Sequence, residues 1–176
     1  MPPHGEMTRY VALLRAVNVG GRQLKMDDLK RIATKLDLGS ARTYIASGNL
    51  LFLSDKKEVQ LKRDLESALE HHMGKRVDVM VRTSGELAAV TGANPFGSEP
   101  ANRVVAIFLD EAPAANVLGS ARNLTDERLA LGKREIYVHF PSGQGQSKLK
   151  LAANASGTAR NMNTVAKLAE LAKELK

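Results

Sequence analysis

The chain has 176 residues and a formal net charge of +7, with 43% hydrophobic and 4% aromatic residues. This length fits one ordinary domain or two small subdomains, and this composition is that of a globular protein with a mostly aliphatic core. The basic balance favours anionic partners such as phosphates or nucleic acid, although many proteins without such partners are equally basic. The absence of cysteine excludes disulfides, a thiolate nucleophile and cysteine-based metal sites.

No segment has the character of a membrane span, because even an apolar run such as Tyr10 to Leu14 is far too short. It also lacks the length and cleavage site of a signal peptide, so we expect no membrane partner and a cytoplasmic location. Residues 1–6 have the character of a leader, with Met7 as the natural start. No set of His, Asp and Glu has metal-ligand spacing, so we expect no metal and no cofactor.

The first half of the chain has the element order β-α-β-β-α-β, which is the ferredoxin-like pattern. Apolar runs and alternation predict strands, the helical period predicts amphipathic helices, and Ser47-Gly48-Asn49 predicts a tight hairpin. The expected strands are residues 8–17, 42–46, 50–53 and 77–81. One helix is expected at residues 27–38, and a second is opened by a capping box of Asp55 and Glu58 and closed by Gly74. A glycine turn, residues 18–22, joins the first strand to the first helix.

The second half repeats this order loosely, as β-α-β-β-α without a closing strand. We expect short helices at residues 85–90 and 148–153, longer helices at 112–121 and 163–175, and strands at 103–109, 127–131 and 135–140. Turns at residues 94–97 and at Pro100 place a boundary near residues 83–102. The predicted fold is therefore α+β, with two ferredoxin-like subdomains in tandem, residues 8–83 and 84–176, the second less regular.

An acid-free stretch near the end of the chain is the main candidate for a site. No acidic residue lies between Glu135 and Glu170, whereas Lys148, Lys150 and Arg160 do. A glycine-rich loop, residues 142–148, lies at one end of this stretch, and the start of the last helix, with Asn163 as its N-cap, lies at the other. Free N–H groups, a helix dipole and cations together favour an anion. An equally simple interpretation is a flexible loop followed by an ordinary helix cap.

A second candidate is the turn at Gly20-Gly21, which follows a strand and precedes a helix, as phosphate-binding turns do. The established dinucleotide and P-loop fingerprints are absent, and any strand-to-helix turn favours glycine. Arg15 is the sharper signal, because it ends an apolar strand, where a charge needs a partner or water. Ser147 and Lys148 do not form a catalytic dyad by sequence alone, since helical neighbours point about 100° apart.

Six separated motifs resemble the bacterial domain-of-unknown-function family 1697. They are RAVNVGG at residues 15–21, MDDL at 26–29, RTYIASGN at 42–49, NPF at 94–96, GQSKL at 145–149 and TARNMNT at 158–164. The motifs occur in the family's order, and the resemblance covers about residues 8–174. Ala16 replaces a usual glycine, and Met162 replaces a frequent tryptophan. The resemblance implies an α+β fold of two subdomains and brings no established activity.

Three functions remain open. The first is binding of a small phosphorylated or other anionic ligand in a cleft between the subdomains, with or without catalysis. The second is an RNA-binding module, for which Tyr10, Tyr44 and Phe52 are the candidate stacking aromatics. The third is a structural or interaction protein without a small ligand. The candidate ligand-binding residues are Arg15, Asn18, Gly20, Gly21, Ser47, Asn49, Ser147, Lys148, Arg160, Asn161 and Asn163. The sequence does not fix a reaction or an oligomeric state.

Overall fold

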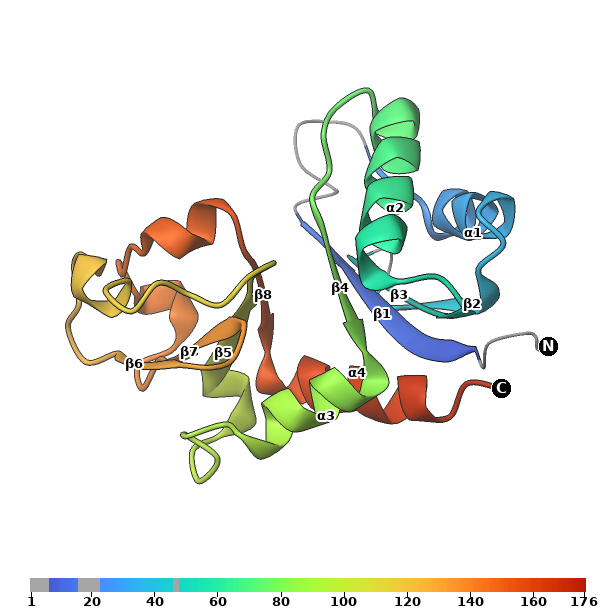
Figure 1. Cartoon of the computed structure of the whole chain (residues 1–176). Coiled ribbons are helices and arrows are strands. Elements are labelled where there is room, and N and C mark those ends of the chain that lie inside the picture. Colours follow the sequence, from blue (N-terminus) through green and yellow to red (C-terminus); the bar gives the residue numbers. More distant parts are fainter. Residues whose placement is uncertain (1–6, 16–22, 46–47) are drawn as a thin grey trace. The chain divides into compact units, whose positions relative to one another are not determined.

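The computed structural model describes residues 7–15, 23–45 and 48–176. It has the expected α+β fold, with two four-stranded antiparallel sheets in the orders β2-β3-β1-β4 and β6-β7-β5-β8 (Figure 1). The strands are β1 Thr8–Leu14, β2 Gly39–Tyr44, β3 Asn49–Ser54, β4 Val79–Thr83, β5 Val104–Phe108, β6 Arg128–Leu131, β7 Glu135–His139 and β8 Thr158–Asn161. The α-helices are α1 Met26–Lys35, α2 Glu58–Met73, α3 Ser84–Gly92 and α4 Met162–Lys173.

The chain divides into two compact units. The N-terminal unit comprises Met1–Leu87 together with Leu168–Lys176, and the C-terminal unit comprises Ala88–Lys167. The end of α4, which the sequence assigned to the second half, thus packs with the first. No helix within the described residues is long and apolar enough to cross a membrane.

Helices α1 and α2 cover one face of the N-terminal sheet (Figure 1). The apolar residues of α2 recur every four positions, at Leu61, Leu65 and Leu69, so they form one buried stripe. Tyr10 and Phe52 lie beneath this layer with their ring centroids 5.6 Å apart. The β-α-β-β-α-β prediction is confirmed in this unit, and its sheet face is closed by helical side chains.

The C-terminal unit has the same strand order, but its crossovers lack α-helices. The helices expected at residues 112–121 and 148–153 are wrong, because these segments hold only the short 3-10 turns Leu118–Ser120 and Ala152–Ala155. Another 3-10 turn is Gln144–Gln146. The helix expected at residues 148–153 does not form because Leu149, Leu151 and Ala153 pack on the core at every second position. That is the period of extended chain and not of a helix.

A closing strand, β8, is present in the C-terminal sheet, contrary to the sequence prediction. It pairs antiparallel with β5, with Ala159 opposite Ile107 and Arg160 opposite Ala106. Its four residues are mostly polar, so no apolar alternation identified it. Helix α4 follows at once, and the Asn161 side chain caps it by accepting a hydrogen bond from the Thr164 N–H at 2.9 Å. The N-cap is therefore Asn161, and the assignment to Asn163 was two residues late.

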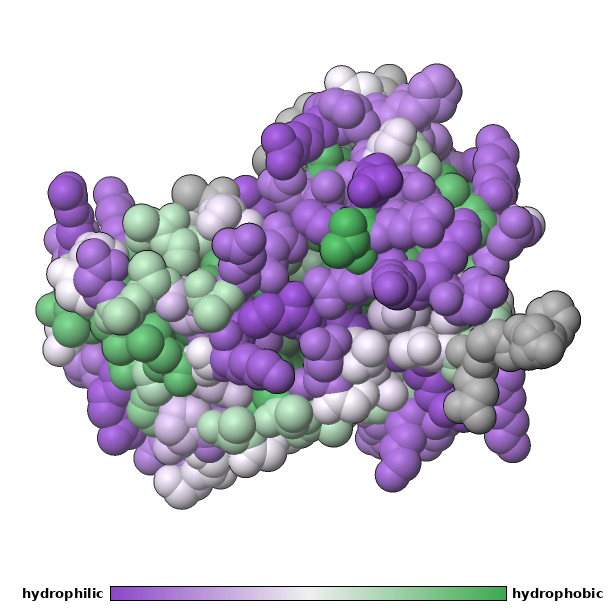
Figure 2. Space-filling model, viewed as in Figure 1, coloured by the Kyte–Doolittle hydropathy of each residue, from purple (hydrophilic) through white to green (hydrophobic). Residues whose placement is uncertain are grey.

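The surface differs between the units in one view. In Figure 2 hydrophilic residues cover most of the visible face of the N-terminal unit, whereas hydrophobic residues gather over the C-terminal unit.

Candidate functional site

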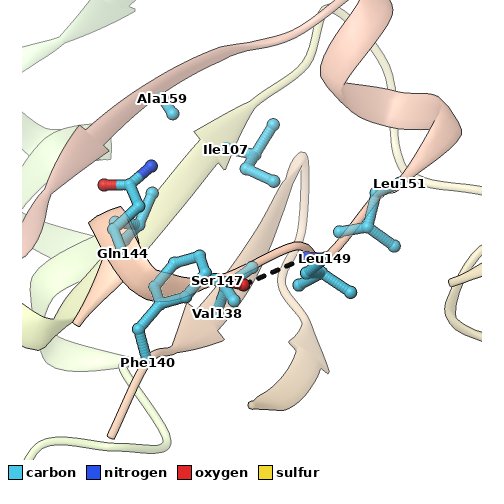
Figure 3. A pocket seen from close by; sticks show the side chains of 9 residues that line it. Ile107, Val138, Phe140, Gln144, Ser147, Leu149, Leu151 and Ala159 are labelled. Atoms are coloured by element: carbon cyan, nitrogen blue, oxygen red, sulfur yellow. Dashed lines mark hydrogen bonds between the residues drawn. The ribbon is translucent and has the colours of Figure 1, made fainter. Parts of the chain in front are cut away.

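A pocket of about 190 Å³ lies on the sheet face of the C-terminal unit that the crossovers cover (Figure 3). Its floor comes from β5, β7, β8 and the residue that follows β7, and its wall from the glycine-rich loop and the segment after it. The floor residues are Val105, Ile107, Val138, Phe140 and Ala159, and the wall residues are Gln144, Ser147, Leu149 and Leu151. The pocket is therefore apolar at its base, with an amide and a hydroxyl among its wall groups.

The pocket exists because this sheet face has no helix over it. On the equivalent face of the N-terminal sheet, α1 and α2 insert leucine and isoleucine side chains between the strands. In the C-terminal unit one part of the corresponding cover is an extended segment, whose alternate side chains Leu149, Leu151 and Ala153 reach the core. Extended chain presents half as many side chains to one face, so it leaves space above the strands.

Two serine–carboxylate hydrogen bonds fasten the glycine-rich loop. Ser142 Oγ donates to Asp126 Oδ2 at 2.6 Å, and Ser147 Oγ donates to Glu127 Oε2 at 2.5 Å. Ser147 Oγ also accepts a hydrogen bond from the Leu149 N–H at 3.1 Å. The loop is thus held at both ends against the segment before β6. An anion placed directly in the loop would face these two carboxylates.

The same hydrogen bonds determine the chemistry of Ser147. Hydrogen bonds from Ser147 and from the Thr125 N–H lower the pKa of Glu127 from 4.5 to about 2. A carboxylate with so low a pKa is a weak base, so it does not remove the serine proton at neutral pH. The Ser147 hydroxyl is engaged with Glu127, and this hydrogen bond fastens the loop.

A second depression of about 460 Å³ adjoins the pocket and shares Phe140 and Ser147 with it. Thr125, Asp126, Glu127 and Ser142 supply oxygen atoms to it. Within the described part of the chain, no three His, Cys, Asp or Glu side chains are grouped as a metal site would require.

The Arg160 side chain leaves β8 on the face of the C-terminal sheet opposite to the pocket and Ser147. Ala159 lines the pocket, and consecutive strand residues point to opposite faces, so Arg160 faces away from it. The half-buried guanidinium donates to Thr158 Oγ1 at 3.2 Å and to the Ala159 carbonyl at 2.9 Å. Burial lowers the pKa of Arg160 to about 10, and the group stays charged at neutral pH. The geometry therefore separates two residues that the sequence grouped in one site.

A polar cluster around the buried His139, on this opposite face, was missed by sequence reasoning. His139 is 3% exposed, and its Nδ1 lies 2.9 Å from Arg128 Nη2 while its Nε2 lies 3.3 Å from Glu99 Oε2. A guanidinium can only donate, so His139 Nδ1 accepts the hydrogen bond from Arg128, and Nε2 faces Glu99. The NPF motif has a role here, because Phe96 stacks on His139 and lies under Arg128. Both ring nitrogens are engaged, which makes the cluster a packing element.

The N-terminal candidates are only partly described. Arg15 forms an ion pair with Asp78 at 3.8 Å, and its N–H donates to the Asp78 carbonyl at 3.0 Å. Asn49 is 2% exposed and donates to the Tyr44 carbonyl at 3.0 Å, so it supports the hairpin. Asn18, Gly20, Gly21 and Ser47 lie outside the described residues. Because Arg15 and Arg160 belong to different units, their expected proximity stays a prediction.

In the C-terminal unit, Lys148 and Asn163 are exposed, whereas Asn161 is half-buried as the helix cap. Of the candidate residues in this unit, Ser147 lines the pocket and Lys148 follows it on the wall segment. These two candidate residues therefore lie at the pocket of the C-terminal unit or directly next to it.

The chain is similar to known proteins over most of its length. Residues 7–137 match the family described as Protein of unknown function (DUF1697). The chain belongs to this family. It is also similar to a solved structure, that of the conserved bacterial protein SP0830 from Streptococcus pneumoniae, with 28% sequence identity and a TM-score of 0.80. The match covers 96% of this chain and 99% of that chain. No curated protein is significantly similar. The resemblance stated from the six motifs is therefore confirmed.

Proposed function

We propose that this DUF1697 protein binds a small phosphorylated or otherwise anionic ligand, with the apolar part of the ligand in the pocket of the C-terminal unit. The observation that carries the proposal is the open apolar floor of that pocket, formed by Ile107, Val138 and their neighbours. Small-molecule sites are concave and mostly apolar, with a few polar groups that orient the ligand. Gln144 and Ser147 are such groups in the wall.

The size of the pocket limits the part of the ligand that it encloses. An apolar cavity of about 150 Å³ accommodates benzene. The pocket here measures about 190 Å³, so it fits one aromatic ring or a short branched alkyl group. A whole nucleotide would extend beyond it.

Binding is favoured over catalysis at this pocket. Ser147 is the nucleophile candidate in the wall, and its carboxylate partner, Glu127, is a weak base. An enzyme would need a base of higher pKa beside the hydroxyl. The RNA-binding alternative loses two of its candidate aromatics, because Tyr10 and Phe52 stack together in the core under the helices. Base stacking requires exposed rings.

The test is a ligand screen on the wild-type protein and on a pocket-filling variant. Phenyl phosphate, a sugar phosphate, a nucleotide and a short RNA are compared by thermal shift, because a ligand that binds only the folded state raises the melting temperature. Ala159→Phe places a ring in the pocket from the edge strand β8, and Ala166→Phe, at an exposed position of α4, is the matched control.

The expected result is stabilisation by a small anion that Ala159→Phe abolishes and Ala166→Phe leaves intact. Stabilisation that persists in Ala159→Phe would place the binding elsewhere and refute the proposed site. Stabilisation by RNA alone would favour the nucleic-acid alternative, and no stabilisation by any compound would favour the structural one.

A further inference from the structure

Three cations line the outer side of the pocket wall. Leu149 and Leu151 point into the pocket, so the alternating residues Lys148 and Lys150 face solvent, and both are exposed. Lys150 also forms an isolated antiparallel bridge with Arg122, in which each N–H donates to the other carbonyl at 2.9 Å. Side chains of directly opposed residues in such a pair lie on the same face, about 5 Å apart at Cβ. Arg122 therefore joins the two lysines.

Their charges are not balanced by neighbouring acids. Like charges directly opposite each other destabilise an antiparallel pair. Among the described residues, none of the three side chains takes part in an ion pair. The nearest acids in sequence to Arg122 on its C-terminal side, Asp126 and Glu127, accept hydrogen bonds from Ser142 and Ser147. The acid-free stretch after Glu135 contains both lysines. An external anion would remove this repulsion.

The cations and the apolar pocket belong to one segment of chain. Residues 148–151 alternate cation, leucine, cation, leucine, with the leucines inside and the cations outside the same wall. A lysine stem has four methylenes, and its ammonium can fold over the edge of an apolar surface while staying in water. A ligand with its apolar end among Leu149 and Leu151 would therefore have its exposed end within reach of these charges.

We propose that Arg122, Lys148 and Lys150 bind the anionic group of an amphipathic ligand, a ring or short branched alkyl chain that carries a phosphate or carboxylate. The inference rests on the proposed function and specifies its ligand class. The anion then lies outside the wall and not in the glycine loop, where Asp126 and Glu127 would oppose it. Inorganic phosphate would contact only the three cations, and a neutral aromatic compound would occupy only the apolar pocket.

The experiment compares three probes by NMR titration: phenyl phosphate, benzyl alcohol and inorganic phosphate. The proteins are the wild type, the double variant Lys148→Gln and Lys150→Gln, the single variant Arg122→Gln, and the control Lys133→Gln, an exposed lysine between β6 and β7. Exposed charge pairs contribute about two- to fivefold each to an affinity. We therefore expect the double variant to weaken phenyl phosphate about tenfold and leave benzyl alcohol unchanged.

Salt provides a second measurement that needs no variant. Added salt screens exposed charges, so the wild-type affinity for phenyl phosphate should fall with ionic strength while that for benzyl alcohol should not. Equal affinities for phenyl phosphate and benzyl alcohol, or a double variant that keeps wild-type affinity for phenyl phosphate, would overturn the inference and leave the pocket as a binding site. An equal loss in Lys133→Gln would also overturn it. If neither aromatic probe binds, both the inference and the proposed function fail.

Discussion

Replacing Asn161 by alanine should destabilise α4, and replacing Asn163 should not. Asn161 precedes the first helical residue, and its Oδ1 accepts a hydrogen bond from the Thr164 N–H, the third position of the helix, at 2.9 Å. Loss of an N-cap side chain costs about 1 kcal/mol, within a range of about 0.5–2 kcal/mol. Asn163 is exposed inside the first turn, where alanine is the better helix former, so its replacement should change stability by less than about 0.5 kcal/mol.

Two measurements distinguish the variants. Urea unfolding followed by circular dichroism gives the global effect as a change in the free energy of unfolding. In a thermal melt, about 1 kcal/mol corresponds to a shift in melting temperature of about 2–4 °C for a chain of this size. Because the chain forms two units, coincident transitions from a second probe are needed before a free energy is assigned. Hydrogen exchange gives the local effect, since the Thr164 amide loses its acceptor only in Asn161→Ala. The reasoning is refuted if Asn163→Ala is the more destabilising variant, or if Thr164 exchange is the same in both.

Five further variants test the packing and the loop. Gly157→Ala should destabilise the protein by about 1–3 kcal/mol, because the added Cβ would lie 2.7 Å from a methyl group of Ile107. Gly145→Ala adds a Cβ with no atom within 4 Å, so thermal melts should show it to be neutral or stabilising by up to about 1 kcal/mol. Glu127, whose pKa falls from 4.5 to about 2 on folding, stabilises the protein above pH 4.5, and this contribution disappears as the pH falls toward 2. The difference in melting temperature between wild type and Glu127→Gln should shrink over that window, and a constant difference would contradict the assignment. Leu168→Ala, at a fully buried position, should cost about 2–5 kcal/mol in urea unfolding. Tyr137→Phe should cost about 1–3 kcal/mol, because it leaves the Val90 carbonyl without its 2.7 Å hydrogen bond.

The N-terminal fold could be predicted because its patterns are local and strong. The stripe of Leu61, Leu65 and Leu69 has the helical period, and Gly74 ends that helix in the left-handed conformation that glycine favours, at φ 73°. The C-terminal unit was harder for a physical reason. Alternation at Leu149 and Leu151 coincided with lysines and alanines that also favour helices, so propensity and period gave different answers.

The candidate site could be predicted only where one segment carries it. The glycine loop drew attention to Ser147 and Lys148; Ser147 lines the pocket, and Lys148 follows it in the chain. The partner of Ser147 is Glu127, twenty residues earlier in the chain. The Arg122–Lys150 bridge spans a similar separation. These contacts depend on how the two crossover segments pack against each other above the sheet. The pattern of residues within one segment does not predict that packing.

The two units share a strand order and differ in how one sheet face is covered, and this difference favours a ligand site in the second unit. In the first, helical leucines such as Leu61 and Leu65 are fully buried against the strands. Burying one such side chain stabilises a fold by about 1.5–3 kcal/mol. The second unit forgoes this gain where extended chain replaces a helix above Ile107 and Val138. A ligand with an apolar end would supply the missing contacts, so its binding should stabilise the second unit and leave the first unchanged.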